Sequence, residues 1–380
     1  MEFLDTLNAD QRRAVTYGVG DGSGDAAGPQ LIIAGAGSGK TTTLASRVAN
    51  LIIHGTAPDR ILLLTFSRRA AVEMTDRVKR IVLSATAASG PAAFRHVSWS
   101  GTFHAVGARL LRSYARQIGL SPDFSIHDRA DSEDLLSLVR HDLGLSEKSL
   151  RFPLKATCLS IYSLALNARQ PLDEILARHY PWCAGFEDQL RELFEAYVAA
   201  KQAQSVLDYD DLLLYWREMM HEPQIAEDVS QRFDCVLVDE FQDTNPLQAD
   251  ILRALKPDGL GVTVVGDDAQ AIYSFRAANV RNILDFPEQY PLPAEVITLE
   301  QNYRSTDAIL AASNAVIAEA REKFTKELFA DRHSNQKPRL VSVSDDLKQA
   351  SYIAQTVLAE REAGTPLKSQ AVLFRTSHHS

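Results

Sequence analysis

The segment Ala-Gly-Ala-Gly-Ser-Gly-Lys-Thr at residues 34–41 constrains the fold of this chain more than any other stretch. It follows an apolar run at 31–34 and precedes a stretch of helical periodicity at 41–53. A glycine-rich loop between a buried strand and a helix aims successive backbone N–H groups at phosphate oxygens, and the helix N-terminus adds its positive end. The segment therefore predicts a phosphate-binding loop, with Ala34 in the place where the strict pattern has glycine.

The side chains at the end of this loop extend the prediction to a nucleotide with its metal ion. Lys40 is expected to reach the β- and γ-phosphates, and the Thr41 hydroxyl is expected to ligate Mg²⁺. The backbone that would cradle the phosphates belongs to Ala36, Gly37, Ser38 and Gly39. The alternative is a glycine-rich turn that binds nothing, but strand, loop, lysine and helix in register favour the phosphate loop.

Two adjacent acids follow the apolar run at 235–238. Ligands gather at the carboxyl ends of strands in open parallel sheets. Asp239 is therefore the candidate for the Mg²⁺ shell, and Glu240 for accepting a proton from the water that attacks the γ-phosphate. The alternative is that Asp239 and Glu240 lie in a solvated turn, where adjacent acids are common.

Gln270 follows a fourth apolar run, at 262–265. It either senses the γ-phosphate at the same sheet edge or is a surface residue.

Apolar runs at 31–34, 61–66, 235–238 and 262–265 alternate with helical stretches, which predicts an α/β domain built on a parallel sheet. The expected organisation is a first part of this domain at 1–108, a helical insertion at 109–205 without a convincing strand, a second part at 206–296, and the start of a second, incomplete α/β domain at 297–380. That last segment is expected to hold helices at 306–324 and 347–361 and strands at 339–343 and 371–374.

Composition narrows the class of protein. With 45% hydrophobic and 23% charged residues, the 380-residue chain is typical of a soluble globular protein. Forty basic and forty-nine acidic residues give a net charge of −9, so a polyanion must be met by a local patch. No apolar run is long enough to span a bilayer, and the acidic N-terminus is unlike a secretory signal, so a cytoplasmic location is expected. Three widely spaced cysteines exclude a disulfide framework and a zinc ribbon.

Seven further segments are informative as an ordered set: 7–15, 65–71, 101–104, 208–212, 239–244, 266–276 and 301–305. Together with the phosphate loop, they resemble the motifs of superfamily one DNA helicases of the UvrD, Rep and PcrA type. The resemblance covers nearly all of the chain. It implies a RecA-like P-loop NTPase domain with an inserted helical subdomain and the beginning of a second RecA-like domain.

The resemblance also implies a function and further site residues. It implies ATP-driven movement on single-stranded DNA, with unwinding at single-strand/duplex junctions, in DNA repair or replication. The implied cofactors are ATP and Mg²⁺. Gln11 is expected to read adenine, Tyr303 to pack on the base, and Arg304 to reach the γ-phosphate from the second motor domain.

Contact with DNA is expected from aromatic platforms and neighbouring cations, which a single-strand binder needs. Phe66, Tyr273 and Phe275 come just after strand ends or in the loops beyond them, and Arg276 directly follows Phe275. Core packing is the alternative for each aromatic, and the resemblance favours DNA. For His104, a structural role and a strand contact are equally compatible with the sequence.

Three departures from the resemblance affect these expectations. Thr42 stands where several relatives carry an arginine near the nucleotide, and Phe275 stands where many have tryptophan. The family's motifs V and VI do not follow 371–376, so an N-terminal fragment is expected. An ATP-gated single-stranded-DNA-binding module without independent helicase activity is therefore the alternative function. A third possible function, that of a small-molecule P-loop kinase, leaves the segment 301–305 unexplained.

Overall fold

The computed structural model describes residues 2–19, 27–86, 96–147 and 150–376. The chain divides into two compact units, Met1–His333 and Ser334–Ser380. Among the described residues, no helix is both long and apolar enough to cross a membrane.

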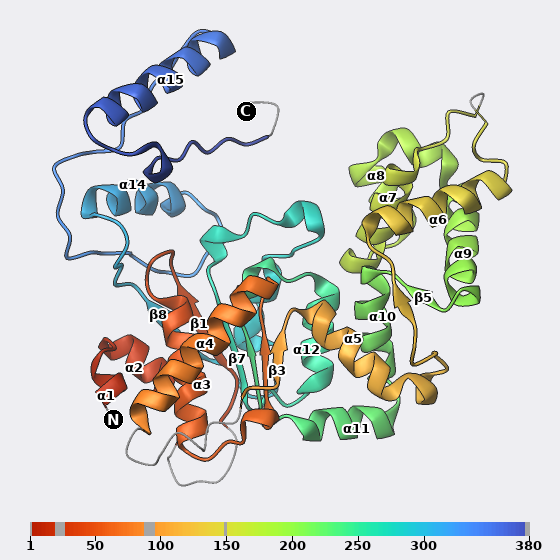
Figure 1. The fold of residues 1–380 in the computed structure, drawn as a ribbon, viewed down its shortest axis with the longest axis horizontal. Coiled ribbons are helices and arrows are strands. Elements are labelled where there is room, and N and C mark those ends of the chain that lie inside the picture. The colour runs from red at the N-terminus through yellow and green to blue at the C-terminus, as the bar shows by residue number, and fades with distance from the viewer. Residues whose placement is uncertain (1, 20–26, 87–95, 148–149, 377–380) are drawn as a thin grey trace. The chain divides into compact units, whose positions relative to one another are not determined.

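A six-stranded parallel sheet forms the centre of the first unit (Figure 1). Its strands are β1 (Gln30–Ala34), β2 (Ile61–Leu64), β3 (Trp99–Gly101), β6 (Cys235–Val238), β7 (Val262–Gly266) and β8 (Glu295–Leu299), in the order β3-β2-β6-β7-β1-β8. The four apolar runs are thus confirmed as strands, and all of their carboxyl ends meet at one edge because every neighbouring pair is parallel. The prediction for 61–66 was two residues too long, and Phe66 lies beyond the strand.

The buried strands read as continuous apolar runs because both faces of the sheet are covered. Leu31 and Ile33 belong to one core, whereas Ile32 and Ala34 belong to the other. Helices α2 (Ala9–Thr16), α3 (Lys40–Ile53) and α4 (Arg68–Ala85) contribute to the second core. Helices α5 (Phe103–Tyr114), α10 (Tyr209–Met219), α11 (Pro223–Arg232) and α12 (Pro246–Leu255) contribute to the first.

Side-chain caps explain why the helices near the sheet edge begin where they do. Ser67 accepts from the N–H of Ala70 at the start of α4, and Thr102 accepts from the N–H of Ala105 at the start of α5. Asn8 forms a capping box with Gln11 in α2. Such caps satisfy backbone donors that the first turn leaves without partners.

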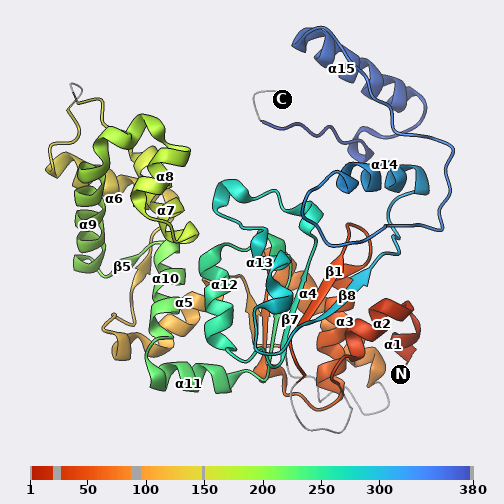
Figure 2. The ribbon, with the colours of Figure 1, turned by 180° about the vertical axis from the view of Figure 1, so that it is seen from behind.

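The helical insertion has a hydrophobic core of its own. Helices α6 (Arg129–Asp142), α7 (Lys155–Ala168), α8 (Leu172–His179) and α9 (Glu187–Ala203) form it beside the sheet, as both ribbon views show (Figures 1 and 2). Two-residue strands, β4 (Ser125–Ile126) and β5 (Val206–Leu207), pair where the chain enters and leaves this region. The prediction of no strand between 109 and 205 therefore missed β4, which is too short to give a periodic signal.

The strand β8 was not predicted, because only two of its five residues are buried and its pattern is therefore not an apolar run. It pairs with β1, so the sheet of the first unit extends to Leu299. Helix α14 (Asp307–Ala318) then ends earlier than the predicted 324. Its last carbonyls, at Ile317 and Ala318, accept hydrogen bonds from the side chain of Lys323.

In the second unit, α15 (Asp346–Glu362) confirms the predicted helix. The predicted strands at 339–343 and 371–374 are wrong, because neither range is a strand in the structure. A strand needs a hydrogen-bonded neighbour, and the described part of this unit holds none. Leu340 and Leu373 are accordingly 96% and 93% exposed.

Candidate nucleotide and nucleic-acid site

The predicted phosphate loop connects the end of β1 to the start of α3 at Lys40. Gly37 and Gly39 have φ angles of 85° and 90°, in the left-handed region that glycine adopts without strain. The N–H and the hydroxyl of Ser38 both donate to the carbonyl of Gly35, at 3.1 and 2.8 Å. The loop is therefore a tight, internally bonded turn at the sheet edge where ligands of parallel sheets bind.

The carboxylates after β6 lie directly across from this loop. The Nζ of Lys40 is 3.0 Å from Oε2 of Glu240, and the side-chain amide of Gln242 donates to the same oxygen at 2.9 Å. Asp239 is buried, and its Oδ1 accepts from the backbone N–H of Glu240 at 3.0 Å. Burial and the neighbouring Glu240 raise the pKa of Asp239 to about 6. The same causes raise the pKa of Asp243, in the turn that follows, to about 6.

Glu240 has a left-handed backbone conformation, with φ 50° and ψ 47°. For a residue with a side chain this conformation costs energy, and such strain concentrates at functional sites. The strain is consistent with a carboxylate held in one position.

The donor set fits Mg²⁺ bound together with a nucleotide. Mg²⁺ is usually held by one or two carboxylates plus substrate phosphates. Asp239 and Thr41 offer a carboxylate and a hydroxyl of this kind. In the described part of the chain, no cluster of three His, Cys, Asp or Glu residues could hold a metal by itself.

Residues at the far end of the loop are linked to α2 and to the segment after β8. The side-chain amide of Gln11 donates to the carbonyl of Ser38 at 2.9 Å, and Asn8 donates to the hydroxyl of Tyr303 at 3.0 Å. The sequence-predicted residues Gln11 and Tyr303 therefore lie at the same end of the phosphate loop, 292 positions apart in the chain.

Asn302 is a site residue that sequence reasoning missed. Its side chain is buried, donates to the carbonyl of Ala36 at 2.5 Å and accepts from the N–H groups of Arg304 and Ser305. The N–H of Tyr303 donates to the carbonyl of Gly37 at 2.9 Å. A Cβ at Gly37 would lie 2.6 Å from the Cβ of Arg304, so the loop and Arg304 are in close contact.

The hydroxyl of Thr42 accepts a hydrogen bond that the sequence did not reveal. Arg77, from α4, donates from Nη1 to the Thr42 hydroxyl at 2.7 Å. A guanidinium therefore stands beside Thr42, supplied from 35 residues further along the chain. No local signal marks Arg77.

A hydrogen-bonded path runs from the carboxylates to the loop after β7. Gln242 bonds to Glu240 through its amide nitrogen, and its Oε1 accepts from the N–H of Asp267 at 2.9 Å. Gln270 donates from its side-chain amide to Asp267. The structure thus connects Gln270 to Glu240 through Asp267, by its side chain and its backbone N–H, and through the side chain of Gln242. Gln270 is partly buried.

The aromatic residues predicted to meet DNA form a row beside this path, which we call the aromatic row: Phe66, Tyr273 and Phe275. Ring centroids are 4.9 Å apart for Phe66 and Tyr273 and 5.7 Å apart for Tyr273 and Phe275. The guanidinium of Arg276 lies 5.6 Å from the centroids of both rings of the 273–275 turn. Phe66 is 42% and Phe275 67% exposed, so neither is a core residue.

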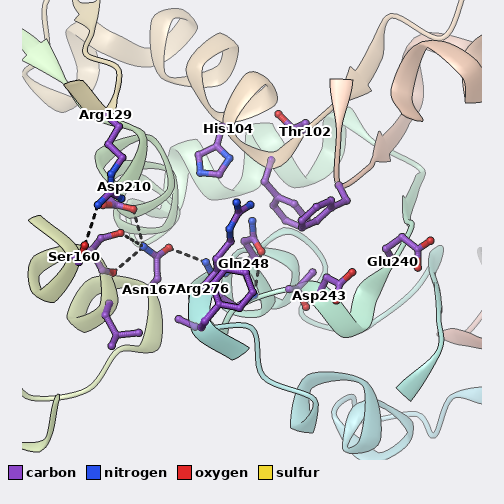
Figure 3. A pocket seen from close by; sticks show the side chains of 18 of the residues that line it. Thr102, His104, Arg129, Ser160, Asn167, Asp210, Glu240, Asp243, Gln248 and Arg276 are labelled. Atoms are coloured by element: carbon purple, nitrogen blue, oxygen red, sulfur yellow. Dashed lines mark hydrogen bonds between the residues drawn. The ribbon is translucent and has the colours of Figure 1, made fainter. Parts of the chain in front are cut away.

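A cavity of about 730 Å³ joins the aromatic row to the carboxylates and to the helical insertion (Figure 3). Phe66, Phe275 and Arg276 line it together with Glu240 and Asp243, and residues of α6 and α7, including Arg129, Ser160 and Asn167, line it from the insertion. Asn167 donates to Asp210 at 2.7 Å and accepts from Asn245 at 2.7 Å, which ties α7 to α10 and to α12. Burial raises the pKa of Asp210.

His104 faces this cavity and packs edge-on against Tyr209, with ring centroids 5.7 Å apart. Burial lowers the pKa of His104 to about 4, so its ring is neutral at pH 7. Any contact of His104 with DNA therefore involves a neutral ring.

The sequence comparisons agree with this geometry. The family model for the UvrD/REP helicase N-terminal domain matches residues 7–291, which is well over half of the chain. The chain belongs to the UvrD/Rep helicase family. The model for the UvrD-like helicase C-terminal domain matches residues 297–380. The match that decides the family therefore spans the helical insertion and every strand of the sheet except β8.

Individual relatives match over 93% or more of the chain. It is 36% identical over 396 aligned residues to the ATP-dependent DNA helicase UvrD1 of Mycobacterium bovis, covering 100% of this chain and 48% of the relative. It is 34% identical to DNA helicase II of Escherichia coli, covering 100% and 49%. It is 35% identical to the ATP-dependent DNA helicase PcrA of Leuconostoc citreum, covering 93% and 46%. The chain thus spans about half the length of these relatives.

Proposed function

We propose that this chain is the ATP-hydrolysing part of a DNA helicase that moves along single-stranded DNA. The observation that carries the proposal is the path from Lys40 and Glu240 through Gln242 to the loop 267–276, which ends in the aromatic row. The candidate nucleotide site and the candidate DNA surface would therefore share this one loop. Each relative named above is described as a DNA helicase, which agrees with the proposal.

In the proposed reaction, the ion pair between Lys40 and Glu240 opens when the nucleotide binds. The γ-phosphate carries more negative charge than a single carboxylate, so it draws Lys40 away from Glu240. Glu240 then accepts a proton from the attacking water. Thr41 and Asp239 would hold Mg²⁺, which would supply positive charge to neutralise the phosphate oxygens.

Arg304 and Gln270 complete the proposed site around the γ-phosphate. Arg304 lies over Gly37 in the phosphate loop, held by Asn302. A guanidinium at this point would stabilise the charge that develops on the transferred phosphoryl group. Gln270 is the proposed γ-phosphate sensor, since it is bonded to the path that begins at Glu240. The backbone of Ala36, Gly37, Ser38 and Gly39 cradles the phosphates.

The base of ATP is proposed to lie at the other end of the loop. Gln11, already bonded to the carbonyl of Ser38, would read adenine, and Tyr303 would pack on it. Thr42, in the first turn of α3 and with Arg77 on its hydroxyl, is a further proposed nucleotide contact. These contacts would select ATP among nucleotides, because only adenine offers the matching hydrogen-bond edge.

Single-stranded DNA is proposed to cross the aromatic row, with the single-strand/duplex junction as the full substrate. Stacking on Phe66, Tyr273 or Phe275 contributes about 1–3 kcal/mol per base and tolerates any sequence. Arg276 offers a cation beside the rings, and His104 a neutral ring on the cavity wall. A net charge of −9 makes such local cations necessary for binding a polyanion.

The alternative is a module that binds single-stranded DNA under the control of ATP without unwinding it. It uses the same residues and differs in turnover, so hydrolysis decides between the two. We expect phosphate release by the 380-residue chain to rise on addition of single-stranded DNA and to be lost in Glu240→Gln. DNA binding that responds to ATP, without phosphate release above that of Glu240→Gln, would favour the module.

A further inference from the structure

A buried ion triad joins the segment after α14 to the loop after β7. The Nζ of Lys326 lies 2.5 Å from Oδ1 of Asp267 and also pairs with Asp268. The side chain of Lys326 is 4% exposed, and those of its two partners are equally buried. The N–H of Phe324 donates to Asp268 at 3.2 Å, so the segment contacts the acid pair twice.

Two adjacent carboxylates repel each other when water is excluded, and a buried charge is strongly destabilising once its partner is removed. Lys326 supplies the compensating charge. The other donors to Asp267 are neutral groups of its own loop, the N–H of Ala269 at 3.1 Å and the side chain of Gln270. In the described part of the chain, no other cation pairs with either acid.

The triad stands at the junction of the nucleotide site and the aromatic row. The N–H of Asp267 is bonded to Gln242 and through it to Glu240, and the loop that Asp267 begins carries Gln270 and Tyr273. We propose that Lys326 is a positioning residue that holds the loop 267–276 in one conformation by neutralising Asp267 and Asp268. Its role in coupling ATP to DNA rests on the proposed function above.

The first test needs neither nucleotide nor DNA, so it is independent of the proposed function. In Lys326→Met, we expect the amides of Ala269 and Gln270 to exchange hydrogen about tenfold faster or more, because the loop opens when its acids repel. The amide of Thr43, bonded to the carbonyl of Gly39, should exchange at the parent rate. Lys79→Met, at an exposed lysine on α4, is the matched control and should change neither.

A suppressor variant separates charge neutralisation from general packing. Adding Asp268→Asn to Lys326→Met removes one of the two repelling charges, so exchange at Ala269 and Gln270 should return toward the parent rate. Unchanged exchange in Lys326→Met, equal acceleration at Thr43, or no recovery in the double variant would each overturn the proposal. If Lys326→Met does not fold, the double variant decides: parent-like exchange supports the proposal, and failure to fold overturns it.

A second test addresses coupling in the parent chain, once it is shown to bind Mg-ATP and a labelled oligonucleotide. Lys326→Met should bind the oligonucleotide at least about fivefold more weakly, because the aromatic row is no longer held in place. Its affinity for ADP, which lacks the γ-phosphate that Gln270 is proposed to sense, should stay within about twofold, since the hydrogen bonds of Lys40, Gln11 and Tyr303 involve other residues. Equal losses for both ligands would overturn the positioning role. Failure of the parent to bind either ligand would instead refute the proposed function.

Discussion

Arg47 offers the sharpest test of how α2 is held against the sheet. It is buried in α3, and its guanidinium donates to the carbonyls of Ala14 and Tyr17 at 3.0 and 2.9 Å and to the hydroxyl of Thr263 at 2.9 Å. No carboxylate pairs with Arg47 among the residues that the structure describes. The perturbation is Arg47→Met, which keeps an apolar stem of similar size and removes all three donors.

The expected loss follows from two opposing terms. Three hydrogen bonds from a charged donor contribute about 1.5–3 kcal/mol each, or about 4.5–9 kcal/mol together. Burial lowers the pKa of Arg47 from 12.5 to about 10, which corresponds to a cost of about 3 kcal/mol for keeping the group charged. The difference predicts that Arg47→Met lowers the free energy of unfolding by about 1.5–6 kcal/mol. In Arg47→Met the carbonyl of Ala14 still accepts from the side chain of Gln30, so we expect a loss in the lower half of this range.

Equilibrium unfolding in urea, followed by circular dichroism, measures this loss. Arg47→Lys is the matched control, because it keeps the charge but cannot reach three acceptors at once. The free energy of unfolding of Arg47→Lys should lie between that of the parent and that of Arg47→Met. Since α2 carries Gln11, Arg47→Met should also narrow the preference for ATP over GTP. A change below about 0.5 kcal/mol in Arg47→Met would refute the hydrogen-bond account, because surface substitutions produce changes of that size.

Three further predictions concern the site itself. Lys40→Ala should weaken Mg-ATP binding in calorimetric titration, whereas Glu240→Gln should bind Mg-ATP normally and release no phosphate; release at the parent rate in Glu240→Gln would exclude Glu240 as the base. Phe275→Ala should weaken single-stranded DNA binding by about 1–3 kcal/mol on oligonucleotides of any sequence, with unchanged ATP affinity, in fluorescence titrations. The pKa of His104 is about 4 in the folded chain and 6.5 in the unfolded chain. Between these pH values the unfolded chain binds more protons at His104 than the folded chain does, so the free energy of unfolding falls as the pH falls from about 6.5 to about 4. The melting temperature of His104→Gln should therefore fall less than that of the parent over this interval, and parallel curves would contradict the assignment.

The parts of the fold that sequence predicted are those with local signals. A run such as 235–238, buried on both faces, reads as a strand without knowledge of its neighbours, and the helical periodicity of the insertion is equally local. The same reasoning failed at 371–374, where strand propensity is present but no neighbouring strand exists in the described part of that unit. It also missed β8, in which only two residues are buried and which is a strand because it pairs with β1.

The parts of the site that sequence missed are contacts between distant residues. Asn302 reaches Ala36 across 266 positions, and Arg77 reaches Thr42 across 35. Lys326 lies 59 positions from Asp267. No periodicity or spacing in the chain encodes such pairs, since each depends on how the sheet and the segment after β8 pack.

Under the proposed function, the path through Gln242 gives a physical reason why the nucleotide and the DNA would share one loop. Lys40 and Gln242 both donate to Oε2 of Glu240, so that oxygen carries two of the bonds that fix the carboxylate. When Lys40 turns to a phosphate, Gln242 becomes the remaining donor to this oxygen. Gln242 is itself confined, because a Cβ on Gly266 would lie 2.6 Å from its Oε1. We therefore expect a movement of Glu240 toward a bound water to be passed to the N–H of Asp267, and so to the loop that carries Tyr273 and Phe275.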